Sequence, residues 1–364
     1  MIARFVYYNN LTMHSQLVFG AGLIGCYLGG VLTHIAQRRE NSGNVSLYCR
    51  PSMADKISSG LTLTDYVHNT LSVENVSIIR SDEEVSPHSV FDIVWLTVKC
   101  TGLQQAVEDM KPFVGQHTLI LCCQNGLDSD HTVREAFPDN EIIRVMVPFN
   151  VVDQENGHFH RGSEGRLTIE SSTHDAMLRD CLCLDGSDDG SVESRLPLDF
   201  TADMTAMQWA KLQLNLGNSI NALANIPVKA MLEQREYRLV IAAMMTELLS
   251  VAKALNLTLP KVASVSAPII PWILRLPNWL FKRVANKMLA IDPTVRTSMW
   301  WDINAGRKTE IEFLNGAVLR NAERLGIDCP VNAKVVDMIH EAEASNNGKD
   351  SISACDLYHM VGLK

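Results

Sequence analysis

Short apolar runs alternate with helical stretches over the first 150 residues of the chain. The run 91–98 is almost unbroken, as expected for a strand that is buried on both faces of a parallel sheet. Further strands are predicted at 16–19, 44–49, 71–79, 117–123 and 142–149, and helices at 23–38 and 101–110. Strands that alternate with helices predict an α/β domain with a doubly wound, Rossmann-type sheet.

The pattern changes near residue 198, where long helical periods replace the alternation. An antiparallel-looking stretch at 157–170 and an acidic surface loop at 185–193 precede the change. Helices are then predicted at 203–224, 233–255, 293–306, 309–326 and 331–344. We therefore predict two domains: a sheet domain at 1–198, which opens with an N-terminal extension at 1–14, and an all-helical substrate domain at 199–364.

Composition narrows the class of protein. The formal net charge is -9, which argues against nucleic acid and anionic membranes as partners. The 9 cysteines form no C-x-x-C pair and several lie in apolar runs, which favours reduced, buried thiols in a cytoplasmic protein. None of the 11 histidines pairs with a cysteine at ligand spacing, so we expect no metal site.

Two segments bear on targeting and assembly. The first ten residues lack a long apolar core and do not have the pattern of a signal peptide. The apolar stretch 267–281 contains Pro271, Arg275 and Pro277, so it is too interrupted to span a bilayer. The wider segment 264–291 forms either helical core, which we favour, or the surface of a homodimer.

A glycine-rich turn follows the first predicted strand. Gly20, Gly22 and Gly25 fit the pattern G-x-G-x-x-G between a strand and a helix. The first glycine permits a tight turn, the second lets backbone N–H groups approach a pyrophosphate, and the third lets helix and strand pack closely. We interpret the turn as a dinucleotide site contacted by residues 20 and 22–25, with Leu23 and Ile24 at the helix N-terminus. The alternative is a structural turn in another α/β protein.

Arg50 ends the second predicted strand, where NAD enzymes commonly carry Asp or Glu to hold the ribose 2′-hydroxyl. A guanidinium instead suits a 2′-phosphate, because it forms charge-assisted and often bidentate hydrogen bonds. This position favours NADP over NAD. The alternative is an ordinary surface arginine.

Three polar side chains in the segment WAKLQLNLGNSINAL share a predicted helix face. Lys211, Asn215 and Asn218 are spaced i, i+4 and i+7, among leucines and isoleucines. One cation and two amides without a carboxylate suggest a pocket wall as readily as an exposed polar face. Elsewhere, Lys99 and the Asn125-Gly126 pair each follow a predicted strand, at the edge where open α/β sheets bind ligands.

With these motifs in view, the sequence resembles the ketopantoate reductase (2-dehydropantoate 2-reductase) family over most of its length. The carrying segments are GAGLIG at 20–25, Arg50, TVK at 97–99, QNG at 124–126, WAKLQLN at 209–215 and SMWWDINAGRKTEIEFLNG at 298–316. The resemblance implies a Rossmann-type domain followed by a helical domain of the 6-phosphogluconate-dehydrogenase type.

The resemblance also implies residue roles. Lys211 would be the general acid, and Glu310 would orient the substrate and the protonated lysine. Asn125 would lie near both nicotinamide and substrate, and Lys99 would line the cofactor side. The polar groups of the substrate would be bound by Asn215 and Ser298, with Asn125 close by. We add Asn218 as a substrate-binding residue because it shares the predicted helix face with Lys211 and Asn215.

Three functions follow from these observations. The first is NADPH-dependent reduction of 2-dehydropantoate to (R)-pantoate in the biosynthesis of pantothenate and coenzyme A. The second is reduction of another 2-oxo acid or an imine, because Ser219 stands where the family often has an asparagine. The third is a non-enzymatic NADP-binding sensor, which is disfavoured because a sensor needs neither Lys211 nor Glu310.

Overall fold

The computed structural model describes residues 14–38, 43–81, 89–182, 196–261, 265–285, 294–345 and 350–364. The acidic loop expected at 185–193 lies outside the described residues, as does all but the last residue of the expected N-terminal extension. The chain forms two compact units. The first contains the described residues up to Ala202 except 99–101 and 125–129, and these two short segments belong with 203–364 to the second.

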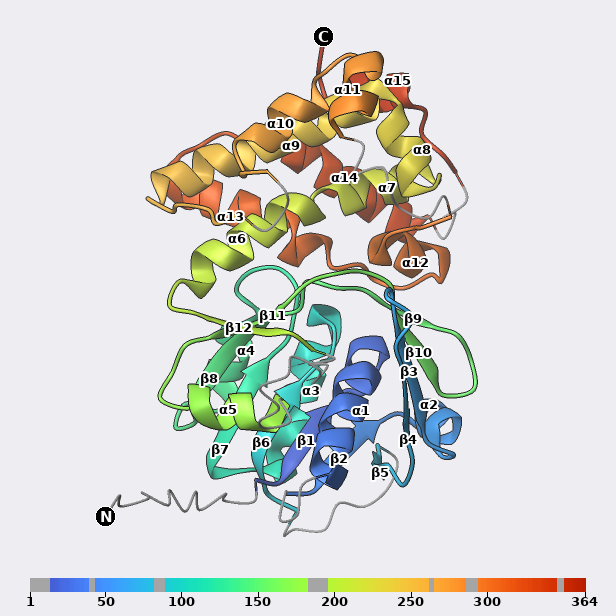
Figure 1. Ribbon diagram of the computed structural model, residues 1–364. Helices are drawn as coiled ribbons and strands as arrows, with labels where there is room; N and C mark the ends of the chain where they lie inside the picture. The colour runs from blue at the N-terminus through green and yellow to red at the C-terminus, as the bar shows by residue number, and fades with distance from the viewer. Residues whose placement is uncertain are drawn as a thin grey trace, which may run out of the picture. The chain divides into compact units, whose positions relative to one another are not determined.

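The first unit is built on an eight-stranded sheet (Figure 1). Across the sheet the order is β12 (Leu198–Thr201), β11 (Leu167–Glu170), β8 (Ile142–Met146), β7 (Val114–Cys122), β6 (Phe91–Leu96), β1 (Gln16–Phe19), β2 (Val45–Cys49) and β5 (Ser77–Arg80). Neighbouring strands are parallel from β8 to β5, β11 is antiparallel to β8, and β12 is parallel to β11. This arrangement confirms the predicted Rossmann-type class.

The central strands are apolar on both sides because a separate core covers each face of the sheet. In β6, Ile93 and Trp95 enter one core, whereas Val94 and Leu96 enter the other. Since alternate residues of a strand point to opposite faces, a strand between two cores reads as a continuous apolar run. Helices α1 (Leu23–Arg38), α2 (Pro51–Ile57) and α5 (Asp175–Leu182) contribute to the first core. Helices α3 (Leu103–Met110) and α4 (Ser129–Ala136) contribute to the second, with the 3₁₀ turns η1 (Cys100–Gly102) and η2 (Lys111–Phe113) flanking α3.

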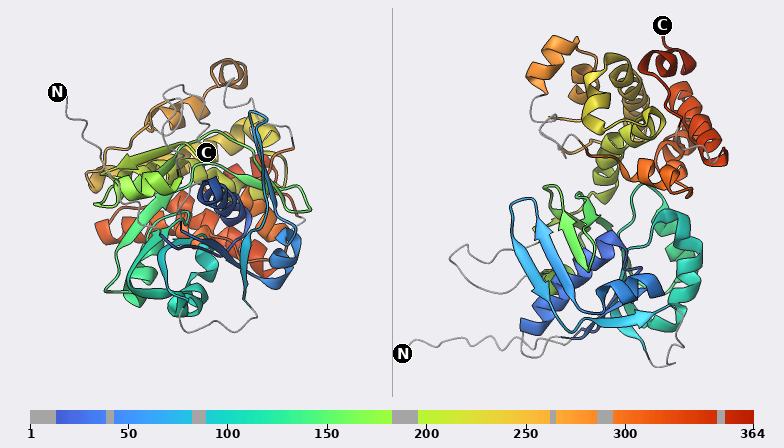
Figure 2. Two further views of the ribbon diagram at one scale, coloured as in Figure 1. Left: turned by 60° about the horizontal axis from the view of Figure 1, so that its bottom comes forward. Right: turned by 90° about the vertical axis from the view of Figure 1, so that its right-hand side faces the viewer.

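A second sheet of four strands packs on α1 in the same unit (Figure 2). Its order is β4 (Thr70–Val73), β3 (Leu61–Asp65), β10 (His158–Arg161) and β9 (Val151–Asp153). The strand predicted at 71–79 is therefore wrong as one element. Asn75 adopts a left-handed conformation (φ 53°), and the chain turns there from β4 into β5 of the larger sheet. The antiparallel stretch predicted at 157–170 likewise divides between the two sheets.

The second unit is helical. Its elements are α6 (Met204–Asn215), α7 (Gly217–Ala224), α8 (Val228–Glu233), α9 (Arg235–Ala254), α10 (Ile269–Leu274), α11 (Asn278–Val284), α12 (Ser298–Asn304), η3 (Ile311–Phe313), α13 (Asn315–Leu325), α14 (Pro330–Ala344) and α15 (Ala354–Met360). Helix α9 is central, and α10, α13, α14 and α15 all pack on it. Each predicted long helical period contains one of these helices or a pair of them.

Helices α10 and α11 lie in the apolar segment for which we favoured a core position. One face of these helices does lie in the core, since Ile270, Ile273 and Phe281 are buried. The other face does not, because Trp272 and Trp279 are 62% and 72% exposed. Among the described residues, no helix is both long and apolar enough to cross a membrane.

Candidate active site

The glycine turn joins β1 to α1 in the first unit. Gly20 has φ +86°, and a Cβ there would lie 2.2 Å from Val98 Cγ1. A Cβ on Gly25 would lie 2.6 Å from Thr97 Oγ1 and 3.0 Å from the Gly20 carbonyl oxygen. Gly22 differs, because it is exposed and the nearest atom to an added Cβ is the Gly20 oxygen at 3.9 Å. The protein itself therefore requires glycine at two of the three positions and leaves open space at the third.

Arg50 directly follows β2 and precedes α2. Its side chain is exposed, and its backbone carbonyl accepts hydrogen bonds from the N–H groups of Met53 and Ala54 at 3.0 Å. The exposed guanidinium thus lies at the carboxyl end of a parallel strand, the edge at which α/β sheets bind ligands. Leu23 and Ile24 open α1, so their N–H groups lie in its first turn, where helical N–H groups lack partners within the helix.

Lys211 and Asn125 meet in the second unit. Lys211 lies on α6 and is half-buried, and its Nζ donates a hydrogen bond to Asn125 Oδ1 at 2.6 Å. Asn125 belongs to the short segment 125–129. This segment follows β7 of the first unit in sequence, but it is part of the second unit. Its neighbour Gly126 has φ +85°, and a Cβ there would lie 2.2 Å from the Phe313 carbonyl oxygen. The glycine therefore lets the segment pack closely on η3.

Glu310 reaches the same group of residues through Cys100. The glutamate is 6% exposed, and its Oε1 accepts a hydrogen bond from the backbone N–H of Cys100 at 3.0 Å. The Cys100 thiol in turn donates to the Asn125 carbonyl oxygen at 3.1 Å. Lys211, Asn125, Cys100 and Glu310 thus form one connected set, which joins three of the predicted site residues.

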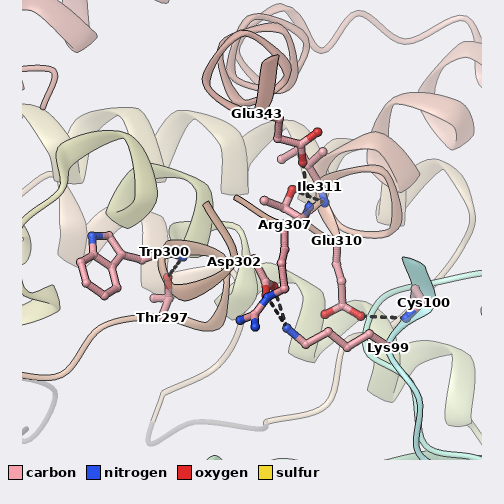
Figure 3. Close-up of polar contacts among 10 residues, drawn as sticks. Lys99, Cys100, Thr297, Trp300, Asp302, Arg307, Glu310, Ile311 and Glu343 are labelled. Atoms are coloured by element: carbon pink, nitrogen blue, oxygen red, sulfur yellow. Dashed lines mark hydrogen bonds and ion pairs between the residues drawn. The ribbon is translucent and has the colours of Figure 1, made fainter. Parts of the chain in front are cut away.

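Lys99 is occupied by an ion pair. Its Nζ donates to both carboxylate oxygens of Asp302 on α12, at 2.8 and 2.7 Å. Arg307 Nε donates to the same carboxylate at 3.1 Å, so two cations share one buried acid (Figure 3). The Asp302 side chain is 3% exposed, whereas those of Lys99 and Arg307 are 49% and 62% exposed. The set has one positive charge in excess and its cations face solvent.

The remaining predicted site residues lie around α6, α7 and α12. Asn215 ends α6 and Asn218 lies in the first turn of α7; both are half-buried. Ser298 is exposed and is the first residue of α12. Ser219 is fully buried and its hydroxyl donates to the Leu216 carbonyl at 2.9 Å, so it is turned into its own helix.

Sequence reasoning missed Cys100, Thr309 and Glu343, which contact the site through backbone or through buried side chains. Cys100 could have been noticed because it directly follows Lys99 at the end of a strand. Glu343 carried no such signal, since a glutamate in the last turn of a helix usually faces solvent. Among the described residues no group of three or more His, Cys, Asp and Glu side chains could hold a metal ion.

Comparison with known proteins identifies the family of the chain. Residues 16–174 match the family model described as "Ketopantoate reductase PanE/ApbA", and residues 203–343 match its C-terminal counterpart, "Ketopantoate reductase PanE/ApbA C terminal". The chain belongs to the ketopantoate reductase family. Members of this family are oxidoreductases acting on CH–OH groups, so the protein is an enzyme of that class.

Named members of the ketopantoate reductase family match nearly the whole chain. A 2-dehydropantoate 2-reductase of Streptococcus pyogenes (serotype M6) is 22% identical over 337 residues, 91% of this chain and 98% of that protein. The crystal structure of a ketopantoate reductase from Ralstonia eutropha has a TM-score of 0.73 and 26% identity, covering 92% of this chain and 99% of its own. A D-mandelate dehydrogenase solved with NADH and anilino(oxo)acetate shares the fold, with a TM-score of 0.69 at 19% identity and coverages of 92% and 99%.

Proposed function

We propose that the protein is an NADPH-dependent 2-dehydropantoate 2-reductase that forms (R)-pantoate for pantothenate and coenzyme A biosynthesis. The observation that carries the proposal is the 2.6 Å hydrogen bond between Lys211 and Asn125, connected through Cys100 to the buried Glu310. The S. pyogenes relative bears the name of this activity. We further propose a cytoplasmic enzyme that forms homodimers, since the ketopantoate reductase of Staphylococcus aureus, which shares the fold, is dimeric.

The glycine turn fits a dinucleotide. The packing of the protein itself does not require a glycine at position 22. A bound ligand would require one, because its pyrophosphate approaches the backbone at this residue. Leu23 and Ile24 would offer N–H groups to the phosphates, and the positive end of the helix dipole would favour them. Arg50 would bind a 2′-phosphate, which favours NADPH over NADH. When bound, the nicotinamide supplies the hydride.

Lys211 is suited to be the general acid. When a ketone carbon gains a hydride, its oxygen becomes a growing alkoxide, and a nearby ammonium both stabilises that charge and donates a proton to the oxygen. Asn125 Oδ1 accepts from Lys211 Nζ and would hold the ammonium in place before substrate arrives. Glu310, anchored on the Cys100 N–H, would help to orient the substrate and the lysine ammonium.

The substrate would be bound by polar groups from three elements. Asn125, Asn215 and Asn218 would contact the carbonyl and hydroxyl oxygens of the substrate, and Ser298 would donate to its carboxylate. Lys99 and Arg307 contribute an excess positive charge beside Asp302, which would attract an anionic 2-oxo acid and an anionic cofactor.

A steady-state assay with purified protein tests the proposal. We expect NADPH oxidation with 2-dehydropantoate, much slower turnover with NADH, and a loss of turnover of at least about a hundredfold in Lys211→Ala. NADPH binding to that variant, followed by fluorescence titration, should remain close to wild type. An active Lys211→Ala enzyme would exclude Lys211 as the general acid, and equal use of NADH would exclude the cofactor assignment.

A different 2-oxo acid is the second candidate substrate. Ser219 favours it, because its hydroxyl is buried and donates within the helix, so it cannot replace the asparagine that the family often has there. Assaying a panel of 2-oxo acids beside 2-dehydropantoate distinguishes the two candidates by kcat/KM. If no oxo acid is reduced although NADPH binds, the sensor function is favoured instead.

A further inference from the structure

Glu343 is a buried carboxylate that binds the loop carrying Glu310. It lies in the last turn of α14, and its side chain is only 4% exposed. Its Oε1 accepts a hydrogen bond from the backbone N–H of Thr309 at 2.8 Å, and its Oε2 accepts from Lys308 Nζ at 3.2 Å. The contact spans 34 residues of sequence, so it ties the loop to a helix formed much later in the chain.

The bound loop leads directly to the site. Thr309 Oγ1 accepts from the Ile311 N–H at 3.2 Å, which fixes the backbone on both sides of Glu310. Glu310 then turns its carboxylate the other way, to the Cys100 N–H at 3.0 Å. Figure 3 shows Glu343 on one side of the loop and the Glu310 carboxylate, pointing at Cys100, on the other.

The second end of the loop is anchored independently. Arg307 donates to Asp302 both from its backbone N–H, at 2.8 Å to the carbonyl oxygen, and from its guanidinium. Between the two anchors Gly306 has φ +63°, a left-handed conformation that lets the chain leave α12 sharply. Residues 306–309 are thus held by Asp302 at one end and by Glu343 at the other.

The Thr309 contact is the stronger part of the Glu343 interaction. Lys308 is 80% exposed, and ion pairs of such exposed side chains contribute little. Burial would raise the pKa of Glu343, but the hydrogen bonds from Thr309 and the charge of Lys308 outweigh it, and the pKa lies below its usual value of 4.5. Glu343 is therefore ionised at neutral pH, and an ionised acceptor forms the stronger bond to a backbone N–H.

We infer that Glu343 is a positioning residue for the reductase reaction: it holds the 308–310 backbone so that the Glu310 carboxylate stays on Cys100, beside Lys211 and Asn125. The inference rests on the proposed function. The hydrogen bonds of the Glu343 side chain go to Thr309 and Lys308, so its effect on Glu310 and Lys211 passes through the loop.

Three variants test this role. Glu343→Ala should lower kcat about tenfold, because a displacement of about 1 Å at a catalytic group costs that much or more, while the Kd for NADPH should stay within about twofold of wild type. Glu343→Gln should recover most of the kcat, because its amide oxygen still accepts from Thr309. Glu341→Ala removes an exposed glutamate from the same helix and should be neutral.

Hydrogen exchange supplies a readout that does not depend on turnover. In Glu343→Ala the N–H groups of Thr309, Ile311 and Cys100 should exchange faster, whereas those of the α14 interior should not. Normal kcat in Glu343→Ala together with an inactive Glu310→Gln enzyme would overturn the inference, as would equal losses in the Gln and Ala variants. Full activity of Glu310→Gln would instead refute the proposed role of Glu310, while the exchange measurement still tests the anchoring of the loop.

Discussion

Gly22 and Gly25 lie in one turn, but different neighbours restrict them. The chain's own atoms exclude a Cβ at Gly25, whereas a Cβ at Gly22 would only make an ordinary contact with the Gly20 oxygen at 3.9 Å. We expect Gly25→Ala to lower the free energy of unfolding by about 1–3 kcal/mol, because the new methyl group is forced against the Thr97 hydroxyl and the Gly20 carbonyl oxygen. Gly22→Ala should unfold like wild type but bind NADPH about tenfold more weakly, because its Cβ occupies space that the pyrophosphate needs.

Urea unfolding and NADPH titration of the two variants separate these effects. The prediction fails if Gly22→Ala binds NADPH normally, since the open space at this position would then have no bearing on cofactor binding. At the residue scale, local sequence was enough to predict where some residues lie in the fold: the glycine turn between β1 and α1, Arg50 directly after β2, and Lys211 on a helix. Their roles in binding and catalysis stay predictions. The pairing of Lys99 with Asp302 was not predictable, because it joins residues 203 positions apart.

At the scale of elements, Arg238 explains how α10 and α11 combine a buried and an exposed side. Its guanidinium is fully buried and donates to the backbone carbonyls of Leu232, Leu274 and Leu276 and to Asn278 Oδ1. It also lies 4.0 Å from the ring centroid of Phe281. These bonds attach both short helices to α9 through backbone groups, so the tryptophans on their outer side need not be buried.

Arg238→Met should lower the free energy of unfolding by about 3 kcal/mol or more, because it removes the guanidinium that donates to the buried carbonyls of Leu274 and Leu276 and to the part-buried carbonyl of Leu232. Arg275→Met, at the residue directly after α10, is the matched control: this arginine is exposed and donates chiefly to Thr246 Oγ1, so its loss should cost below about 1 kcal/mol. Equal losses in the two variants, measured by urea unfolding, would show that burial of Arg238 is unimportant. Sequence periodicity could not reveal this anchor, because a charged residue in a helix is normally expected on its solvent face.

At the scale of the whole molecule, three carboxyl groups predict how stability responds to acid. Burial alone would raise the pKa of Asp153, Glu170 and Glu343. Each pKa is nevertheless lowered, because Lys56 binds Asp153, Arg144 binds Glu170, and Glu343 accepts hydrogen bonds from Thr309 with a smaller contribution from Lys308. A group whose pKa is lowered in the folded state stabilises it above the unfolded pKa, here near 3.8 for Asp and 4.5 for Glu. That stabilisation is lost as the pH falls through the folded pKa.

The unfolding temperature should therefore be nearly constant from about pH 6 to 8 and should fall below about pH 4.5. Glu170→Gln removes one of the three groups, so its unfolding temperature should be lower than wild type at pH 7 and converge with it in acid. A constant difference between the two proteins across this range would contradict the pairing of Glu170 with Arg144.

The division into a sheet unit and a helical unit was predictable, because the change of hydrophobic period near residue 198 is long and clear. The second sheet could not be predicted. Its strands are short, and two of them precede the central strands β6, β7 and β8 in sequence whereas the other two follow them. Nor did any pattern indicate that 99–101 and 125–129 belong to the helical unit. These segments read as ordinary loops after strands, and their placement depends on the contacts with Asp302, Glu310 and Lys211.

That placement has a consequence for protein engineering. Exchanging the helical part between two members of this family by one cut after Ala202 would transplant Lys211, Asp302 and Glu310 but leave Asn125, Lys99 and Cys100 with the parent. Such a hybrid would join partners drawn from different ancestors at three contacts of the site: Lys211 with Asn125, Asp302 with Lys99, and Glu310 with Cys100. A recombination scheme that moves the two short loops together with residues 203–364 would keep each set of partners intact.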